Sequence, residues 1–171
     1  MIHATDSKGT FYILNKKDRT PIIFIHGVGL DHSIWDPQIN EFDNTVLIYD
    51  ILGHGKTPLN KNDLGFDDFS DQILNLMDEL KFNKVHLVGF SIGSLIARNF
   101  ATRFNDRLAS LTLLCSIFNR SDKEQKIVND RFEQTKKDQK LAKDALKRWF
   151  TEDFLNKNPD ISDKIFTILQ N

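Results

Sequence analysis

The sequence is poor in the features that define several large protein classes. Its single cysteine, Cys115, has no partner for an internal disulfide and lies in the apolar run LTLLC, where we expect a small buried side chain. Acidic and basic residues are interspersed and leave a net charge of −1. This balance predicts no nucleic-acid partner.

Long apolar runs are also missing. No stretch approaches the roughly 20 apolar residues of a membrane span. The first residues, MIHATDSKGT, do not form a basic segment followed by an apolar one, as a secretory leader would. We therefore expect a cytoplasmic protein without a membrane partner.

Apolar runs and amphipathic stretches alternate from residue 10 to residue 115, which predicts an α/β fold with a mostly parallel sheet flanked by helices. We expect an outer strand at residues 10–15 and central strands at residues 21–26, 45–50, 84–90 and 108–115. Helical spacing begins after the acidic pair Asp67 and Asp68, and a second helix should follow Ser91. From residue 119 onward charged residues dominate, and one apolar helix face is formed by Leu141, Ala145, Leu146, Trp149 and Phe150.

Six of the eight glycines fall in three motifs, HGVG at 26–29, GHG at 53–55 and GFSIG at 89–93, and each motif follows a predicted strand. The last motif has the pattern G-x-S-x-G around Ser91. The pattern alone recurs by chance, but a strand before it and a helix after it are what a nucleophile elbow requires. Gly89 and Gly93 would let the strand and the helix approach closely. We therefore predict that Ser91 is a nucleophile.

Two backbone N–H groups are candidates for an oxyanion hole. Ile92 would begin the helix after Ser91 and direct a free N–H toward a developing negative charge. Val28, in the flexible HGVG loop, could direct a second N–H at the same oxygen. We expect the neighbouring His26 to shape this loop through hydrogen bonds rather than to act as a base.

The order PIIFIHGVGLDHSIW, YDILGHGKT and VHLVGFSIGSLIARNFA resembles the α/β-hydrolase superfamily. The resemblance covers about residues 1–115 and implies that Ser91 is the nucleophile and that Val28 and Ile92 form the oxyanion hole, with no metal or organic cofactor. It divides the chain into a core at residues 1–118 and a helical lid at residues 119–171. Within the lid, RWFTEDF and NPDISDKIFTIL are similar to 3-oxoadipate enol-lactonases. Leu52 departs from the family, in which many members carry Arg or Pro.

A serine nucleophile needs a base, and all five histidines of the chain precede Ser91. In the α/β-hydrolase family the acid and the histidine follow the nucleophile. We therefore expect this chain to be the N-terminal part of a longer hydrolase, truncated within the lid. The acid and histidine would lie beyond Asn171, and the chain alone would be nearly inactive.

The leading interpretation is a hydrolase of small carboxylic esters or lactones that forms an acyl-enzyme on Ser91. Trp35 and the lid residue Trp149 could wall its acyl pocket, although aromatic residues at such positions also serve plain packing. The same half-chain fits carbon–carbon bond hydrolases and acyltransferases of this fold. A noncatalytic binding module that kept the fold is a separate alternative. The sequence does not define the oligomeric state.

Overall fold

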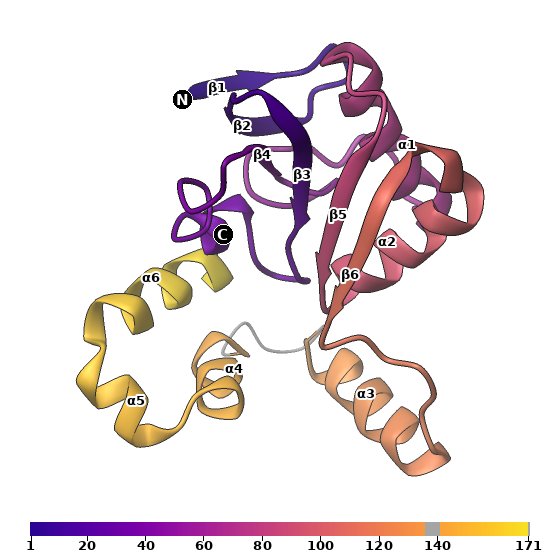
Figure 1. The fold of residues 1–171 in the computed structure, drawn as a ribbon. Coiled ribbons are helices and arrows are strands. Elements are labelled where there is room, and N and C mark those ends of the chain that lie inside the picture. Colours follow the sequence, from indigo (N-terminus) through magenta and orange to yellow (C-terminus); the bar gives the residue numbers. More distant parts are fainter. Residues whose placement is uncertain (136–140, 171) are drawn as a thin grey trace. The chain divides into compact units, whose positions relative to one another are not determined.

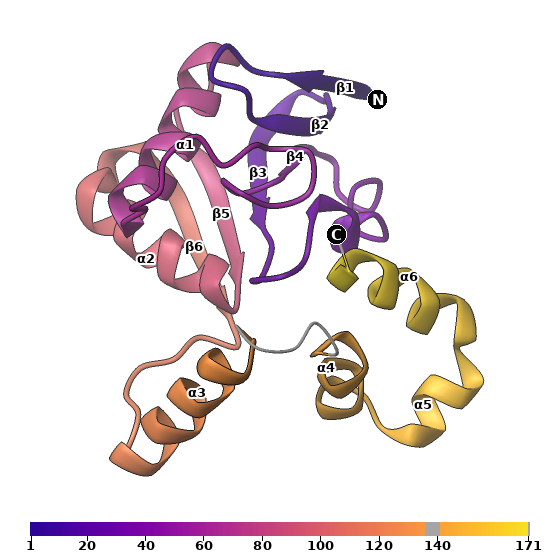
Figure 2. The same cartoon turned by 180° about the vertical axis from the view of Figure 1, so that it is seen from behind.

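The computed structural model describes residues 1–135 and 141–170 of the chain. It divides into two compact units, Met1–Ser116 and Ile117–Asn171, which are described separately (Figures 1 and 2). Among the described residues, no helix combines the length and apolar character that crossing a membrane requires.

The first unit is built on a six-stranded sheet in the order β1-β2-β4-β3-β5-β6 (Figure 1). Strands β4, β3, β5 and β6 pair in parallel with one another, whereas β2 pairs antiparallel with both β1 and β4. The predicted α/β fold, a mostly parallel sheet with flanking helices, is confirmed. The strands are β1 (Ile2–Thr5), β2 (Phe11–Asn15), β3 (Arg19–Ile25), β4 (Asn44–Tyr49), β5 (Val85–Phe90) and β6 (Leu108–Leu114).

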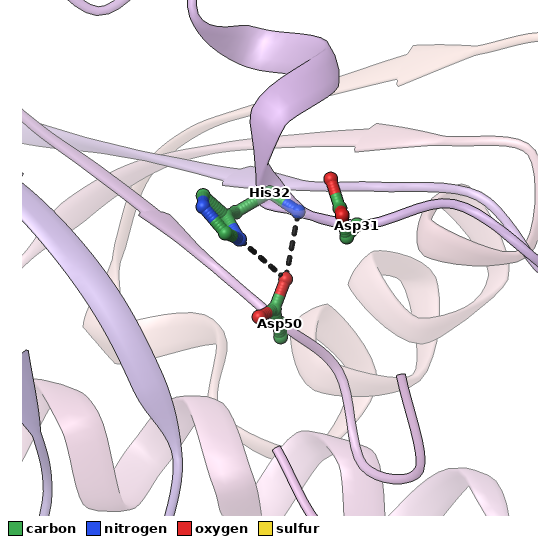
Figure 3. Close-up of side chains that lie close together, drawn as sticks. All are labelled: Asp31, His32 and Asp50. Atoms are coloured by element: carbon green, nitrogen blue, oxygen red, sulfur yellow. Dashed lines mark hydrogen bonds and ion pairs between the residues drawn. The ribbon is translucent and has the colours of Figure 1, made fainter. Parts of the chain in front are cut away.

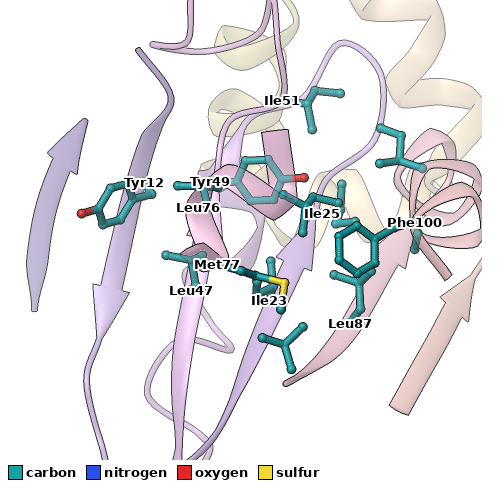
Figure 4. Close-up of a cluster of buried hydrophobic side chains, with 14 of the residues drawn as sticks. Tyr12, Ile23, Ile25, Leu47, Tyr49, Ile51, Leu76, Met77, Leu87 and Phe100 are labelled. Atoms are coloured by element: carbon teal, nitrogen blue, oxygen red, sulfur yellow. The ribbon is translucent and has the colours of Figure 1, made fainter. Parts of the chain in front are cut away.

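Strand alternation supplies two apolar clusters, one on each face of the sheet. Ile23 and Ile25 of β3 join the larger cluster, to which two helices contribute several residues, Met77 and Phe100 among them (Figure 4). Ile22 and Phe24 of the same strand point to the other face and pack in the second cluster. The helices of this unit are η1 (His32–Trp35), α1 (Phe66–Glu79), α2 (Ile92–Arg103) and η2 (Asn105–Arg107). The two helices predicted after Asp67 and after Ser91 are confirmed as α1 and α2.

Two predicted strand positions are wrong. Residues 10–15 form β2, which is not the outer strand, because β1 pairs with its free side from Ile2 to Thr5. Residues 108–115 were expected at the centre, but β6 is the edge strand on the other side, and most of its residues are exposed. Its apolar composition is that of a strand covered on both faces, yet Leu111, Leu113 and Leu114 are 37–38% exposed.

The second unit is helical, with α3 (Asp122–Thr135), α4 (Leu141–Trp149), α5 (Glu152–Lys157) and α6 (Pro159–Gln170). Helices α4 and α5 both contact α6. Ala145 and Leu146 are buried on α4, as the predicted apolar face requires, whereas Trp149 remains 45% exposed. Thr151 caps α5 by accepting the Phe154 N–H at 3.2 Å.

Candidate active site

Ser91 occupies the sharp turn between β5 and α2. Its φ of 55° and ψ of −119° lie in a region that non-glycine residues rarely enter, at a cost of about 1–3 kcal/mol. A hydrogen bond ties this turn to the neighbouring strand, because the Ser91 N–H donates to the Leu114 carbonyl at the end of β6, at 3.0 Å. The half-buried side chain therefore stands where the strand ends and the helix begins.

The two glycines of the motif are required by close backbone packing. A Cβ on Gly89 would lie 2.2 Å from the Gly93 carbonyl oxygen. A Cβ on Gly93 would lie 2.6 Å from the Ile25 carbonyl oxygen and 2.7 Å from that of His26. Because real Cβ atoms do not approach backbone oxygens this closely, only glycine allows α2 to start directly against β3.

The HGVG loop after β3 lies against the same turn. The position of a Cβ on Gly27 would be 3.3 Å from the Ser91 Cβ and 3.2 Å from the Phe90 ring. Ile92 is the first residue of α2, so its N–H has no acceptor within the helix. Over residues 1–135 and 141–170, no hydrogen bond occupies the N–H of Val28 either, and its side chain is 58% exposed. The structure brings the two candidate donor residues to the loop and the turn that meet at Ser91, and their role as an oxyanion hole remains a prediction.

His26 is held as a structural side chain. Its Nδ1–H donates to the Gly27 carbonyl at 2.8 Å, and its Nε2 accepts the Ile51 N–H at 3.0 Å. Complete burial lowers the pKa of His26 to about 4, and the nearby His54 ring adds to this effect. A neutral imidazole with both nitrogens engaged cannot take a proton from Ser91, in agreement with the predicted loop-shaping role.

The structure also gives the positions of His54, His86 and His3. His54 Nδ1 faces its own loop at the Leu52 carbonyl, 3.1 Å away, and His86 Nδ1 faces Ser110 Oγ at 2.8 Å. His3 lies on the edge strand β1. No hydrogen bond found in the described part of the chain joins a histidine to the Ser91 hydroxyl.

His32 forms a buried pair with Asp50 (Figure 3). One carboxylate oxygen accepts from both His32 Nδ1–H and the His32 backbone N–H at 2.7 Å, and the other accepts the Lys56 N–H at 2.9 Å. Burial opposes ionisation, but these hydrogen bonds outweigh it and hold the pKa of Asp50 below its usual range. A Cβ on Gly55 would lie 2.4 Å from this carboxylate, so the Asp50–Thr57 turn wraps tightly around it.

Asp31, His32 and Asp50 are the described residues whose possible metal-ligand atoms cluster, all within 4.8 Å of one another. Asp31 accepts from the Ser33 N–H at 2.9 Å and the Ser33 hydroxyl at 2.6 Å, which caps η1. The three side chains thus join the loop after β3 to the loop after β4. Asp50 lies in the quoted stretch YDILGHGKT, but no signal in the sequence pointed to its partner His32.

The sequence predicted burial of Cys115 and a place in the acyl pocket for Trp35 and Trp149. The expected burial of Cys115 is wrong, because it follows the exposed strand β6 and is itself exposed. Trp35 is 8% exposed and packs against Phe24 with ring centroids 4.8 Å apart. Trp149 belongs to the second unit. Contact of either tryptophan with a substrate remains a prediction.

A family model described as the alpha/beta hydrolase fold matches residues 20–160. The chain belongs to the α/β-hydrolase family. The match includes the HGVG loop, the Asp50 turn and the Ser91 turn, and each of them has a glycine that this structure packs tightly or holds at positive φ.

Within the α/β-hydrolase family, the chain is 28% identical over 150 residues to the (E)-2-((N-methylformamido)methylene)succinate hydrolase of Acinetobacter baylyi, covering 86% of this chain and 57% of the relative. It is 24% identical over 164 residues to 3-oxoadipate enol-lactonase 2 of the same organism, covering 95% of this chain and 61% of the relative. The crystal structure of the enol-lactonase from Burkholderia xenovorans superposes with a TM-score of 0.76 at 26% identity, over 99% of this chain and 68% of that one. The chain therefore spans about three-fifths of the length of these two curated relatives.

Proposed function

We propose that this chain carries the nucleophile and oxyanion hole of a serine hydrolase that acts on carboxylic ester or lactone bonds, similar to 3-oxoadipate enol-lactonases. The observation that carries the proposal is the positive φ of Ser91 in a turn that packs against the HGVG loop. A Cβ on Gly27 of that loop would lie 3.3 Å from the Ser91 Cβ. Maintaining an unfavourable backbone conformation at a serine between a strand and a helix supports a chemical role for its hydroxyl.

In the proposed reaction Ser91 Oγ attacks the acyl carbon of the substrate and loses its proton to a base. The negative charge that develops on the former carbonyl oxygen accepts hydrogen bonds from the N–H groups of Val28 and Ile92. A donor of this kind contributes about 3 kcal/mol to stabilising the transition state. The C–O bond then breaks, the alcohol leaves with the proton, and water hydrolyses the acyl-enzyme.

The base in this proposal is a histidine outside residues 1–171, assisted by an acid that also lies outside them. The reason is the placement of the histidines within the chain. His26 is neutral and engaged at both nitrogens, and His32 is paired with Asp50. The 171 residues alone should therefore turn over substrate slowly, with the residual rate that the oxyanion hole and binding supply.

The names of two relatives support the proposed substrate class. One is named as a hydrolase of a substituted succinate and another as a lactonase of 3-oxoadipate, and both names describe small carboxylic acid derivatives. We infer a small ester or lactone of this kind as the substrate. The proposed chemistry involves no metal or organic cofactor.

Chemical rescue tests the nucleophile and the missing base together. The 171-residue protein is assayed with p-nitrophenyl butyrate at increasing imidazole concentration, beside Ser91→Ala and the control Ser110→Ala. We expect hydrolysis above the Ser91→Ala background to rise with imidazole in the unchanged protein and in Ser110→Ala. Equal rates in Ser91→Ala and the unchanged protein at every imidazole concentration would refute the assignment of Ser91.

Labelling with a fluorophosphonate distinguishes the hydrolase from a noncatalytic binding module of the same fold. An activated Ser91 should form a covalent adduct, which mass spectrometry locates on the peptide containing residues 85–98. A longer form of the protein that is folded by circular dichroism, and that neither reacts with the probe nor hydrolyses the ester, would favour the binding module.

A further inference from the structure

A groove of about 590 Å³ lies at the edge of the sheet where the parallel strands β3 and β5 begin. Its lining includes five cations and one acid, although the whole chain has a net charge of −1. We call this the basic groove and define it by Lys16, Lys17, Asp18, Arg19, Lys81 and Lys84.

The fold brings these residues together from two connections. Residues 16–18 join β2 to β3, which begins at Arg19, and residues 80–84 join α1 to β5 (Figures 1 and 2). Because β3 and β5 are parallel neighbours, with Ile22 opposite His86, the residues that precede them lie at the same edge of the sheet. Ser91 follows the opposite, carboxyl end of β5, so the basic groove is separate from the candidate active site.

Some of the positive charge in the basic groove is free. Lys17 donates its ammonium group to the Phe42 carbonyl, and Arg19 pairs with Asp43 at 3.4 Å. In the described residues, by contrast, no hydrogen bond or ion pair engages the exposed ammonium groups of Lys16, Lys81 and Lys84. Three uncommitted cations around one groove attract an anion with several negative groups more strongly than one with a single charge.

The end of α1 does not oppose this charge. Negative partial charge gathers at the last carbonyls of a helix. Here the Met77 and Asp78 carbonyls accept the N–H groups of Phe82 and Lys81, which turn the chain toward β5. Lys81 itself adopts a φ of 59°, and its side chain belongs to the lining of the groove. The two carboxylates at the end of α1 also have partners: Asp78 pairs with Arg107 at 2.8 Å, and Glu79 accepts the Ser7 N–H at 3.0 Å.

We propose that the basic groove binds a small molecule bearing two or more phosphate groups. Its volume is in the range of small-molecule sites, which are about 300–1,000 Å³. Lysine ammonium groups bind phosphate oxygens as point charges with three donors each. The near-neutral charge of the chain gives a long polyanion little attraction beyond the groove, so the size of the site selects a small ligand.

Isothermal titration calorimetry of the 171-residue protein with inorganic tripolyphosphate, at low ionic strength, tests the proposal. The test variant is Lys81→Gln with Lys84→Gln. The matched control is Lys123→Gln with Lys126→Gln, which removes the same charge at the same spacing from the second unit. Acetate, with one negative charge, serves as the ligand control. Circular dichroism checks that both variants are folded.

We expect saturable binding of tripolyphosphate, about tenfold weaker in the test variant and unchanged in the control variant, with no binding of acetate. Absence of tripolyphosphate binding would overturn the proposal. Equal weakening in both variants would overturn it as well, because it would show a general charge effect. Undiminished binding in the test variant would show that tripolyphosphate binds outside the basic groove, and this result would also overturn the proposal. None of these results depends on Ser91.

Discussion

Replacing Gly93 by alanine tests whether close backbone packing fixes the turn at Ser91. The added Cβ would lie 2.6 Å from the Ile25 oxygen and 2.7 Å from the His26 oxygen, so α2 and β3 must separate by several tenths of an ångström. Both oxygens belong to the backbone and cannot rotate away as a flexible side chain can. Overpacking of this kind costs about 1–3 kcal/mol, and we expect the upper end, about 3 kcal/mol. For a chain of this size that lowers the melting temperature by about 6–12 °C.

Urea unfolding followed by tryptophan fluorescence measures this change. A Trp149→Phe background leaves Trp35, which is buried in the first unit, as the only emitter. The matched control is Gly65→Ala, because a Cβ on Gly65 would meet only Asp68, at 3.8 Å. We expect that control to cost at most about 1 kcal/mol, as a helix N-cap change. If Gly93→Ala lowers the free energy of unfolding no more than Gly65→Ala does, the packing argument for the turn is wrong.

Three further predictions concern buried polar groups. The Tyr49 hydroxyl is buried without a hydrogen-bond partner in the described residues, so Tyr49→Phe should raise the free energy of unfolding by about 1 kcal/mol in a urea titration; a loss of stability would show that the hydroxyl has a partner. His26 takes up a proton near pH 6.5 when unfolded but only near pH 4 when folded, so stability should fall by about 3 kcal/mol as the pH drops between these values; a flat profile would contradict its burial as a neutral ring. Gly55→Ala places a Cβ 2.4 Å from the Asp50 carboxylate at a φ of 53°, and should lower the melting temperature by at least as much as Gly93→Ala; a smaller loss would mean that the loop moves freely.

The central strands and the helices beside them were predictable because burial on both faces leaves a continuous apolar signal. Residues 22–25 of β3 point alternately into the two clusters, so all four of these positions are apolar. The edges of the sheet were not predictable, because there the apolar signal does not follow the position of the strand. Strand β1 has one partner and mostly exposed residues, which leaves no apolar pattern in IHAT. Strand β6 has the composition of a central strand but lies at the edge of the first unit.

The candidate site was predictable where a short motif encodes local geometry. The G-x-S-x-G pattern located the Ser91 turn because both glycines are needed within five residues of sequence. The contact of Gly27 with that turn depends on strands that are 60 residues apart, and only the parallel pairing of β3 with β5 creates it. The His32–Asp50 pair joins two loops 18 residues apart in the sequence, and nothing in the spacing of those residues announces it.

The geometry of the described residues separates the placement of Ser91 from its activation. Placement is complete in the first unit, because the φ of 55°, the bond from Ser91 N–H to Leu114 and the packing of Gly93 on β3 all lie within it. Activation needs a proton acceptor, and His26 and His32 are engaged in hydrogen bonds that join loops instead. If Ser91 is correctly placed but has no base, a base added in solution should still take its proton. Added imidazole therefore tests the placement of Ser91 separately from its activation. A rate that rises with imidazole would mean that the turn is preorganised for catalysis independently of the group that removes the proton.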